Sequence, residues 1–280
     1  DGYTTSTRYS FSGLVERVQE HEVFKGLTTE ATTSYTYDHA GRLGKTEQVA
    51  SSGSSTTGTV TLAANAYNAL GQLKEKNLAN GRQSVDYAYN IRGWLTSINN
   101  PDDLTAAGNS DTYADLFGMR LGYDGTTATG ARSQHNGNIA EAVWRTGYGT
   151  LKRSAYGYSY DALNRLTGSD YWTTPASTLT NSTAYEERGL TYDSNGNIKT
   201  LTRTKADGSV LNGLTYSYSG NRLSAISGGT AYAYDRNGNM TTDGMRGFSV
   251  EYNQLNLPKR VSRGTENISY IYSATGSKLA

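Results

Sequence analysis

The chain has 280 residues, with 26 Lys and Arg residues interleaved among 25 Asp and Glu residues. The formal net charge of +1 leaves no basic stripe that would suit a nucleic acid or an anionic membrane surface. No stretch of the sequence reaches the roughly 18 apolar residues of a membrane-spanning helix. We therefore expect neither a nucleic-acid partner nor a membrane span.

Tyrosine is the main large side chain, with 23 copies beside 3 Trp and 4 Phe residues. Each buried aromatic side chain removes roughly 150–250 Å² from water, so the tyrosines are predicted to form the core. Because every hydroxyl needs a partner, this composition favours a thin sheet with one wet face.

Cysteine is absent, which does not decide the compartment. The first residues, DGYTTSTRYS, lack the features of a signal peptide, and the sequence is predicted to be a segment of a longer protein.

Strand patterns with a period of two recur along the chain and predict an all-β fold. Residues two apart share one face of a strand, and aromatic or apolar residues alternate in this way at 85–89, 156–160, 214–218, 248–252 and 268–272. In chain order we expect hairpin repeats over 1–98, an insertion over 99–135 with a short helical turn near 111–117, and hairpin repeats over 136–280. All three parts are predicted to belong to one continuous segment.

A turn motif follows the strands. It reads Tyr, then Asp, Asn or Ser, two variable residues, Gly, then Arg, Asn or Gln, and finally Leu, Ile or Met. A type I turn favours Asp, Asn or Ser at its first position. At its fourth position it favours Gly, which readily adopts a positive φ. Asn takes the Gly position in some copies, because it tolerates that conformation next best. Residues 219–223 are one residue short and predict a tighter turn. The residues expected to build the repeat turns are Tyr37, Asp38, Gly41, Tyr160, Asp161, Asn164, Tyr192, Asp193, Gly196, Tyr234, Asp235, Gly238, Tyr272 and Gly276.

The repeats are expected to form an array. One hairpin cannot bury its own face, so neighbouring hairpins must lie side by side in an antiparallel sheet. We call the tyrosine that precedes each turn the motif tyrosine. The motif tyrosines are Tyr37, Tyr67, Tyr89, Tyr123, Tyr160, Tyr192, Tyr218, Tyr234, Tyr252 and Tyr272.

The Tyr-Asp pairs at 37–38, 160–161, 192–193 and 234–235 resemble the YD repeats of the RHS family. The runs YNIRGWLTSIN (89–99), DLFGMRLGYD (115–124) and NGNIAEAVW (136–144) are similar to the version found in Bacteroidetes surface proteins. The family includes Tc-toxin C components and animal teneurins. The resemblance implies hairpins stacked into a spiralling sheet that forms part of a hollow shell, which in bacterial members often holds a C-terminal toxin. The family's DPxG-type core and its aspartate self-cleavage site have no counterpart in these residues.

Candidate chemistry is sparse. His21 and Glu22 begin like a HExxH motif, but Lys25 occupies its fifth position, and His39 and His135 have no metal-binding spacing. The segments after Asp193 and Asp235 faintly resemble a calcium loop, yet their Gly is fourth rather than sixth. We expect no catalytic residue, no metal site and no cofactor.

Two functions stay open on this basis. The first is a structural shell segment of a secreted or bacterial cell-surface protein that encloses or presents a C-terminal passenger such as a toxin. Its partners would be the rest of the same polypeptide, meaning an N-terminal plug, a C-terminal RHS core and a possible toxin, together with glycans or the secretion machinery. The alternative is a cell-surface adhesion or carbohydrate-binding module, for which Trp94, Trp144 and Trp172 are the candidate contacts. An enzyme is not expected.

Overall fold

The computed structural model describes residues 2–105, 113–148, 152–174 and 178–279. These residues form strands, turns and irregular segments, and none of them lies in a helix. The all-β, antiparallel fold predicted from the sequence is confirmed. The strands fall into two compact units, which we call unit 1 (residues 1–156 and 172–180) and unit 2 (residues 157–171 and 181–280).

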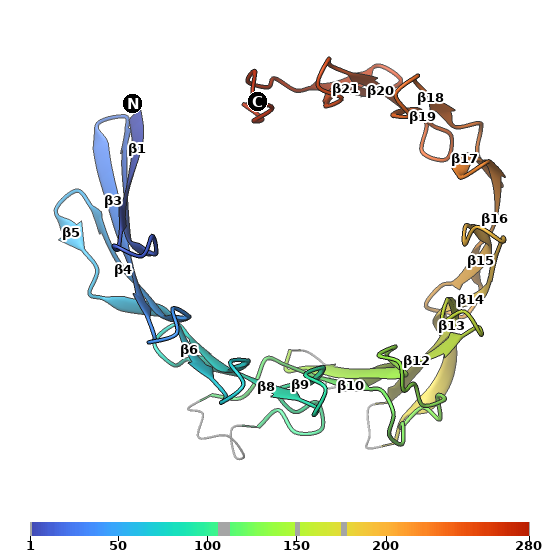
Figure 1. Cartoon of the computed structure of the whole chain (residues 1–280), viewed down its shortest axis with the longest axis horizontal. Coiled ribbons are helices and arrows are strands. Elements are labelled where there is room, and N and C mark those ends of the chain that lie inside the picture. Colours follow the sequence, from blue (N-terminus) through green and yellow to red (C-terminus); the bar gives the residue numbers. More distant parts are fainter. Residues whose placement is uncertain (1, 106–112, 149–151, 175–177, 280) are drawn as a thin grey trace. The chain divides into compact units, whose positions relative to one another are not determined.

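Unit 1 is a meander in which successive strands pair antiparallel. Strand β4 pairs with β3, with the two-residue β5 and with β6, and all other pairs follow chain order up to β11 (Figure 1). Strands β12 (Arg153–Tyr160) and β13 (Leu166–Thr174) contribute residues to both units, and β14 (Thr180–Tyr192) does so through its first residue, Thr180. The strands of unit 1 are β1 (Gly2–Tyr9), β2 (Val15–Phe24), β3 (Leu27–Tyr37), β4 (Leu43–Ser52), β5 (Ser55–Thr56), β6 (Val60–Tyr67), β7 (Leu73–Leu78), β8 (Gln83–Tyr89), β9 (Leu95–Ile98), β10 (Phe117–Gly122) and β11 (Glu141–Thr146).

Unit 2 continues with the same design. A meander from β14 to β17 is followed by a second one from β18 to β22, and a single bridge between Ala225 and Ala231 joins their adjoining segments. The strands are β14 (Thr180–Tyr192), β15 (Ile198–Thr204), β16 (Val210–Ser219), β17 (Arg222–Ile226), β18 (Ala233–Tyr234), β19 (Met240–Asp243), β20 (Phe248–Tyr252), β21 (Pro258–Arg263) and β22 (Glu266–Ser269).

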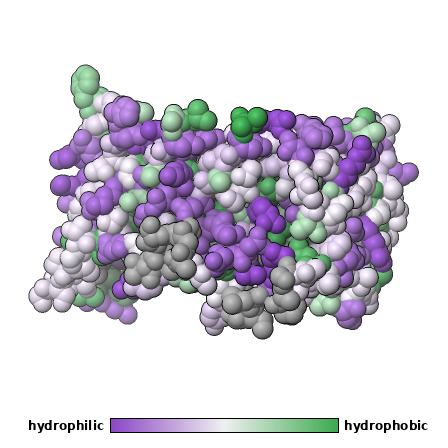
Figure 2. All heavy atoms as spheres, turned by 90° about the horizontal axis from the view of Figure 1, so that it is seen from below, coloured by the Kyte–Doolittle hydropathy of each residue, from purple (hydrophilic) through white to green (hydrophobic). Residues whose placement is uncertain are grey.

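Side-chain burial alternates along the strands as the period-two pattern predicts. In β16, Leu214, Tyr216 and Tyr218 are half-buried, while the residues between them are exposed. The same alternation runs along β20. Figure 2 shows mainly hydrophilic residues on the visible face, with hydrophobic residues in small scattered patches.

The prediction that the tyrosines form the core needs correction. Among them only Tyr123 is buried, and the other motif tyrosines of the described strands are half-buried. The most enclosed cluster consists of the smaller residues Val143, Ala155 and Leu179, with Trp172 packed against it. The accessible surface of 17323 Å² explains this, because a compact protein of 30.3 kDa would expose only about 11,800 Å². In a single-layer sheet, side chains on adjacent strands cover a tyrosine ring only from the sides. Its outer part therefore remains exposed to solvent.

Two local expectations can be compared with the structure. The shortened turn at 219–223 is indeed tighter, because Ser219 pairs with Arg222 and only Gly220 and Asn221 lie between them. Gly220 has a φ of 61°, as the first residue of a type II′ turn requires. The helical turn expected near 111–117 falls partly outside the described residues; residues 113–116 lie in bends and irregular structure, and Phe117 begins β10.

Candidate functional site

The hydroxyl of a motif tyrosine donates a hydrogen bond to a backbone carbonyl of the preceding hairpin. Tyr37, at the end of β3, lies 2.8 Å from the carbonyl oxygen of Val15, the first residue of β2. We call this contact a tyrosine bridge. It recurs from Tyr67 to Leu43 (2.9 Å), Tyr89 to Leu73 (3.0 Å), Tyr123 to Leu95 (2.9 Å), Tyr192 to Leu166 (2.5 Å), Tyr218 to Ile198 (2.8 Å), Tyr234 to Leu223 (2.9 Å), Tyr252 to Met240 (2.9 Å) and Tyr272 to Pro258 (3.0 Å).

Eight of the nine tyrosine bridges lie where the backbone pairing between two hairpins ends. Between β2 and β3 the last pair is Arg17 with Ser34, which lies two residues after the acceptor and three before the donor. The same offset holds for the junctions closed by Tyr67, Tyr89, Tyr123, Tyr218, Tyr252 and Tyr272. It also holds at Tyr234, where the last backbone pair is the isolated pair of Ala225 with Ala231. The tyrosine therefore caps the ladder and marks one fixed register between hairpins.

The hydroxyl supplies the donor that the diverging backbone no longer offers. A hydrogen bond of this kind contributes about 0.5–1.5 kcal/mol net, and a carbonyl left without a donor costs a similar amount or more. Burial raises the pKa of Tyr123, Tyr192 and Tyr218, so these phenols keep the proton that the bridge needs. Phenylalanine could fill the same space but could not make this bond.

The turns are built around a carboxylate that binds its own backbone. In the first Tyr-Asp copy, Oδ1 of Asp38 accepts hydrogen bonds from the backbone N–H groups of Ala40 and Arg42, both at 2.9 Å. Oδ2 of Asp38 lies 2.7 Å from Nε and 2.7 Å from Nη2 of Arg42. The backbone bond from Arg42, followed by its side-chain bond, lowers the pKa of Asp38. Asp161 and Arg165 repeat the arrangement.

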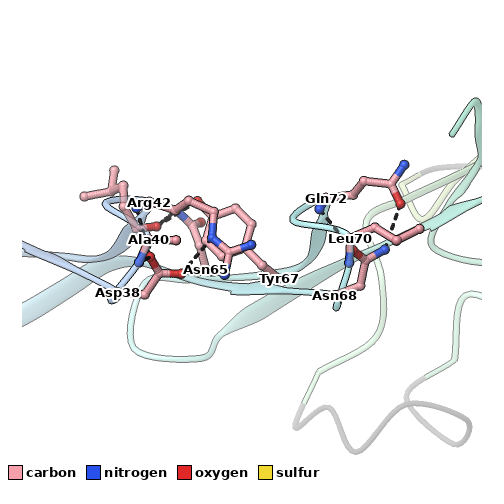
Figure 3. A network of polar contacts seen from close by, with 9 residues as sticks. Asp38, Ala40, Arg42, Asn65, Tyr67, Asn68, Leu70 and Gln72 are labelled. Carbon is pink, nitrogen blue, oxygen red and sulfur yellow. Dashed lines mark hydrogen bonds and ion pairs between the residues drawn. The ribbon is translucent and has the colours of Figure 1, made fainter.

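The arginine of one turn also covers the motif tyrosine of the next repeat. The guanidinium carbon of Arg42 lies 4.6 Å from the centre of the Tyr67 ring (Figure 3). The guanidinium carbon of Arg165 lies 4.6 Å from the centre of the Tyr192 ring. Since Asp38 holds Arg42 in place, the acid, the arginine and the next tyrosine form one chain of contacts. A cation over an exposed aromatic ring contributes roughly 0.5–1 kcal/mol.

Turns with the sequence Asp-x-Asn-Gly-Asn use amides for the same purpose. Asn197 donates to Oδ2 of Asp193 at 2.9 Å and to Oδ1 of Asn221, in the following turn, at 3.1 Å. Asn195 adds a second bond to the same oxygen at 3.0 Å. The turn of Asp235, Asn237 and Asn239 contacts Asn256 in the same way. Successive turns therefore touch one another along one edge of the sheet, and we call this series the turn ladder.

The close approach of successive turns restricts the Gly position. Gly71 has a φ of 82°, and a Cβ added to it would lie 3.1 Å from Nη1 of Arg42. Gly93 has a φ of 80°, and its added Cβ would lie 3.2 Å from Nε2 of Gln72. At Gly71 and Gly93, glycine therefore suits both the positive φ of the turn and the close approach of a side chain from the preceding turn.

Comparison with known proteins agrees with this geometry. A family model described as the teneurin YD-shell matches residues 109–279, and one described as the RHS repeat matches residues 67–105. The chain belongs to the teneurin YD-shell family.

A solved structure shares the fold of this YD-shell chain. It is the pore form of the Photorhabdus luminescens Tc holotoxin carrying a mutation in TccC3, and the match has a TM-score of 0.69 at 19% identity. The match covers 99% of this chain and 13% of that one, so the chain spans about an eighth of the length of its structural relative. No curated protein sequence matches it.

The residues predicted to build the YD-shell turns lie in the turn ladder. Positive φ angles occur at Gly41 (75°), Asn164 (62°), Gly196 (88°), Gly238 (90°) and Gly276 (85°). Tyr160 ends β12 and lies in the same position relative to Asp161 as the other motif tyrosines do to their turns. Tyr192, Tyr234 and Tyr272 each form a tyrosine bridge, and Asp193 and Asp235 each accept bonds from their own turn.

Two features of the YD shell were missed from the sequence. One is the role of the tyrosine hydroxyl, which no local pattern reveals because its acceptor lies in another hairpin. The other is a repeat turn at Ser10, where Gly13 has a φ of 82° and donates to the Ser10 carbonyl at 3.1 Å. Tyr9, Ser10 and Gly13 fit the motif, but Leu14 stands where it has Arg, Asn or Gln.

Two groups of polar contacts join residues 99–120 to their neighbours, one buried around Asp115 and one more exposed around Asp102. Asp115 is 3% exposed and accepts bonds from Nδ2 of Asn99 at 3.0 Å and Nε2 of Gln83 at 3.3 Å. Asp102 contacts the guanidinium groups of Arg120 and Arg153. Burial alone would raise the pKa of Asp102, but the bonds from these two arginines outweigh burial and lower it.

Within the described part of the YD shell, no group of three or more His, Cys, Asp or Glu side chains could hold a metal ion. Nε2 of His21 lies 3.9 Å from Glu30, and no helix in this part is long and apolar enough to cross a membrane. Many polar groups of the described repeats hold turns and hairpins together.

Proposed function

We propose that this segment is part of a wall that encloses or presents a C-terminal passenger polypeptide, such as a toxin, in a secreted or bacterial cell-surface protein. The observation that carries the proposal is the uniform junction between hairpins. One register and one tyrosine bridge recur in both units, so hairpins can be added to the sheet without a gap. Such a sheet acts as a barrier.

The same observations favour a role without catalysis. The carboxylates of the turns bind their own backbone, and no metal-binding cluster lies in the described segments. The partners would then be other parts of the same polypeptide, namely an N-terminal plug, an RHS core and the passenger. Residues 99–135 would be an insertion into the wall rather than a domain of their own. The structural relative belongs to a holotoxin, which supports a toxin as the passenger.

Carbohydrate binding is less well supported, because the three tryptophans pack within the sheet. Trp94 lies 5.1 Å from the ring centre of Tyr123, and Trp144 stacks on Tyr156 at 5.6 Å. Trp172 packs against the buried cluster of unit 1. A sugar platform would need at least one of these rings to present a free face.

Limited proteolysis tests enclosure in a longer polypeptide that contains this segment and a passenger. We expect the passenger to resist cleavage until the wall unfolds. A matched variant with Tyr89→Phe and Tyr192→Phe, which lacks two tyrosine bridges, should release cleavable passenger at a lower urea concentration. If the passenger is cut as fast as an exposed tail in both proteins, the wall does not enclose it.

A further inference from the structure

Asparagine is followed directly by glycine at five places in the chain. Such pairs can deamidate, because glycine has no side chain that would hinder the attack of its backbone nitrogen on the preceding amide. The fold decides which pair can react, since the glycine nitrogen must be free to attack and the amide nitrogen free to leave. The pairs are Asn80 with Gly81, Asn136 with Gly137, Asn195 with Gly196, Asn212 with Gly213 and Asn237 with Gly238.

The pairs in the turn ladder are protected by hydrogen bonds. The backbone N–H of Gly196 donates to the carbonyl of Asp193 at 3.1 Å. Nδ2 of Asn195 donates to Oδ1 of Asn221 at 3.0 Å. The attacking nitrogen and the leaving nitrogen are thus both held by other partners. The turn that contains Asn237 repeats both contacts, so the same protection is expected there.

Two further pairs are restrained by backbone pairing or by packing. Asn212 and Gly213 lie within the ladder between β15 and β16, where the backbone cannot bend without breaking the sheet. Gly137 is half-buried, and a Cβ added to it would lie 3.2 Å from the ring of Trp94. The residue that follows Asn136 therefore has little room to move.

The pair of Asn80 and Gly81 lacks these restraints. It lies in the hairpin turn between β7 and β8, and both residues are exposed. Among the described residues, the N–H of Gly81 donates no hydrogen bond, and neither does Nδ2 of Asn80. Within this part of the chain, the attacking nitrogen and the leaving nitrogen are both available.

The oxygen of the Asn80 amide is held by strand β6. Oδ1 of Asn80 accepts the backbone N–H of Thr61 at 2.7 Å, and the N–H of Asn80 donates to the Thr61 carbonyl at 2.9 Å. The Thr61 donor draws electron density away from Cγ, and it lies at a distance suited to an oxygen that gains negative charge during attack. Thr61 therefore favours reaction at this amide.

We infer that Asn80 is a site of spontaneous deamidation. The backbone nitrogen of Gly81 forms a bond to Cγ of Asn80 and loses its proton to solvent, while the bond from Cγ to Nδ2 breaks and ammonia leaves. Water then adds to one carbonyl carbon of the resulting cyclic imide and breaks the bond of that carbon to nitrogen. The product is aspartate or isoaspartate at position 80, and nothing is oxidised or reduced. The inference does not depend on whether the wall encloses a passenger.

The turn can retain an aspartate product. Its carboxylate keeps an acceptor for the N–H of Thr61, and a hydrogen bond to an ionised acceptor is stronger than one to a neutral amide. An isoaspartate product instead adds a methylene group to the backbone of the turn. It would disturb the neighbouring bond from the N–H of Arg82 to the carbonyl of Leu78, which is 3.0 Å long.

Peptide mass spectrometry of the whole chain, incubated at mildly alkaline pH in water enriched in heavy oxygen, tests the inference. Each deamidation takes one oxygen atom from the solvent, so the label marks reactions that occur during the incubation. We expect the peptide with Asn80 to gain label about tenfold or more faster than the peptides with Asn195 and Asn237, because reactions that require local opening are slow. In the urea-unfolded chain, the rates of all five pairs should converge.

Two variants test the contact with Thr61. Asn80→Asp should keep the urea midpoint of the natural chain. Asn80→Gly suits the φ of 60° but lacks the acceptor, so it should lower the midpoint. Equal losses in both variants would contradict the contact and with it the inference. Faster labelling of Asn195 or Asn237 than of Asn80 in the folded chain would overturn the inference. So would an equal lead of Asn80 in urea, because the sequence rather than the fold would then select it.

Discussion

The hydroxyl of Tyr89 lies 3.0 Å from the carbonyl oxygen of Leu73, at a point where the backbone ladder between β7 and β8 has already ended at Glu75 and Asp86. The side chain thus replaces a backbone donor where two hairpins separate. Because the same relation recurs in both units, the tyrosine of the repeat serves the junction between hairpins as well as the packing of its own strand. Phenylalanine could not make this bond, which gives a reason for tyrosine rather than phenylalanine at the nine positions that form a bridge.

Removing one hydroxyl should weaken one junction. Tyr89→Phe leaves the Leu73 carbonyl without its donor, so we expect the free energy of unfolding to fall by about 1 kcal/mol in urea titrations. Tyr67→Phe should cost less, because Nδ2 of Asn65 still lies 2.9 Å from the same acceptor, the carbonyl oxygen of Leu43.

The matched control for this experiment is Tyr35→Phe. Tyr35 is half-buried on β3, and its hydroxyl has no partner in the described segments, so its loss should change stability little. If Tyr35→Phe and Tyr89→Phe destabilise the protein equally, the hydroxyl bond is not what holds the junction.

Gly71 should tolerate a side chain poorly, because its turn packs against Arg42 of the preceding turn. Gly71→Ala places a methyl group at a φ of 82° and 3.1 Å from Nη1 of Arg42. The conformation alone costs about 1–2 kcal/mol, and Arg42 must also shift away from Tyr67. We expect thermal unfolding at a lower temperature for this variant. Gly58→Ala, where an added Cβ meets no atom within 4 Å, should leave the midpoint unchanged, and an equal loss for both would argue against stacking.

The sequence was sufficient to predict the local structure but not the contacts between repeats. The strand alternation at 214–218 and the turn at Asp38 depend on neighbours within a few residues, so both were predictable. The acceptor of Tyr37 lies 22 residues away in another hairpin, and nothing local marks the Val15 carbonyl as free. Composition favoured a thin sheet with one wet face, but it did not show that the tyrosines of such a sheet would stay half-buried while smaller residues form the enclosed cluster.

The amide contacts of unit 2 should depend on an oxygen at position 221. Oδ1 of Asn221 accepts from Asn195 and Asn197, so Asn221→Ala should lower the free energy of unfolding by about 1 kcal/mol. Asn221→Asp keeps an acceptor and suits the same tight turn, so it should restore most of the loss. Urea titration of the natural chain, Asn221→Ala and Asn221→Asp measures these free energies of unfolding. Equal losses for both variants would show that residue 221 stabilises its own tight turn rather than the contact with Asn195 and Asn197.

Acid should weaken the turn ladder through its carboxylates. Side-chain and backbone bonds from Asn197 lower the pKa of Asp193, and Asn239 acts in the same way on Asp235. The backbone bond from Arg165 is the main cause that lowers the pKa of Asp161. A lowered pKa in the folded state means that the folded protein favours the carboxylate. Its stabilising effect is therefore complete above the unfolded pKa of about 3.9 and is lost as the pH falls through the lower folded value.

We therefore expect the urea midpoint to stay level from about pH 7 to pH 5 and to fall steeply below about pH 4. Asp193→Asn removes one titrating carboxylate, so this variant should start from a lower midpoint at neutral pH and decline less on acidification. The difference should persist in added salt, because short hydrogen bonds rather than distant charges cause the shift. An unchanged acid slope in Asp193→Asn would show that acid acts elsewhere in the protein.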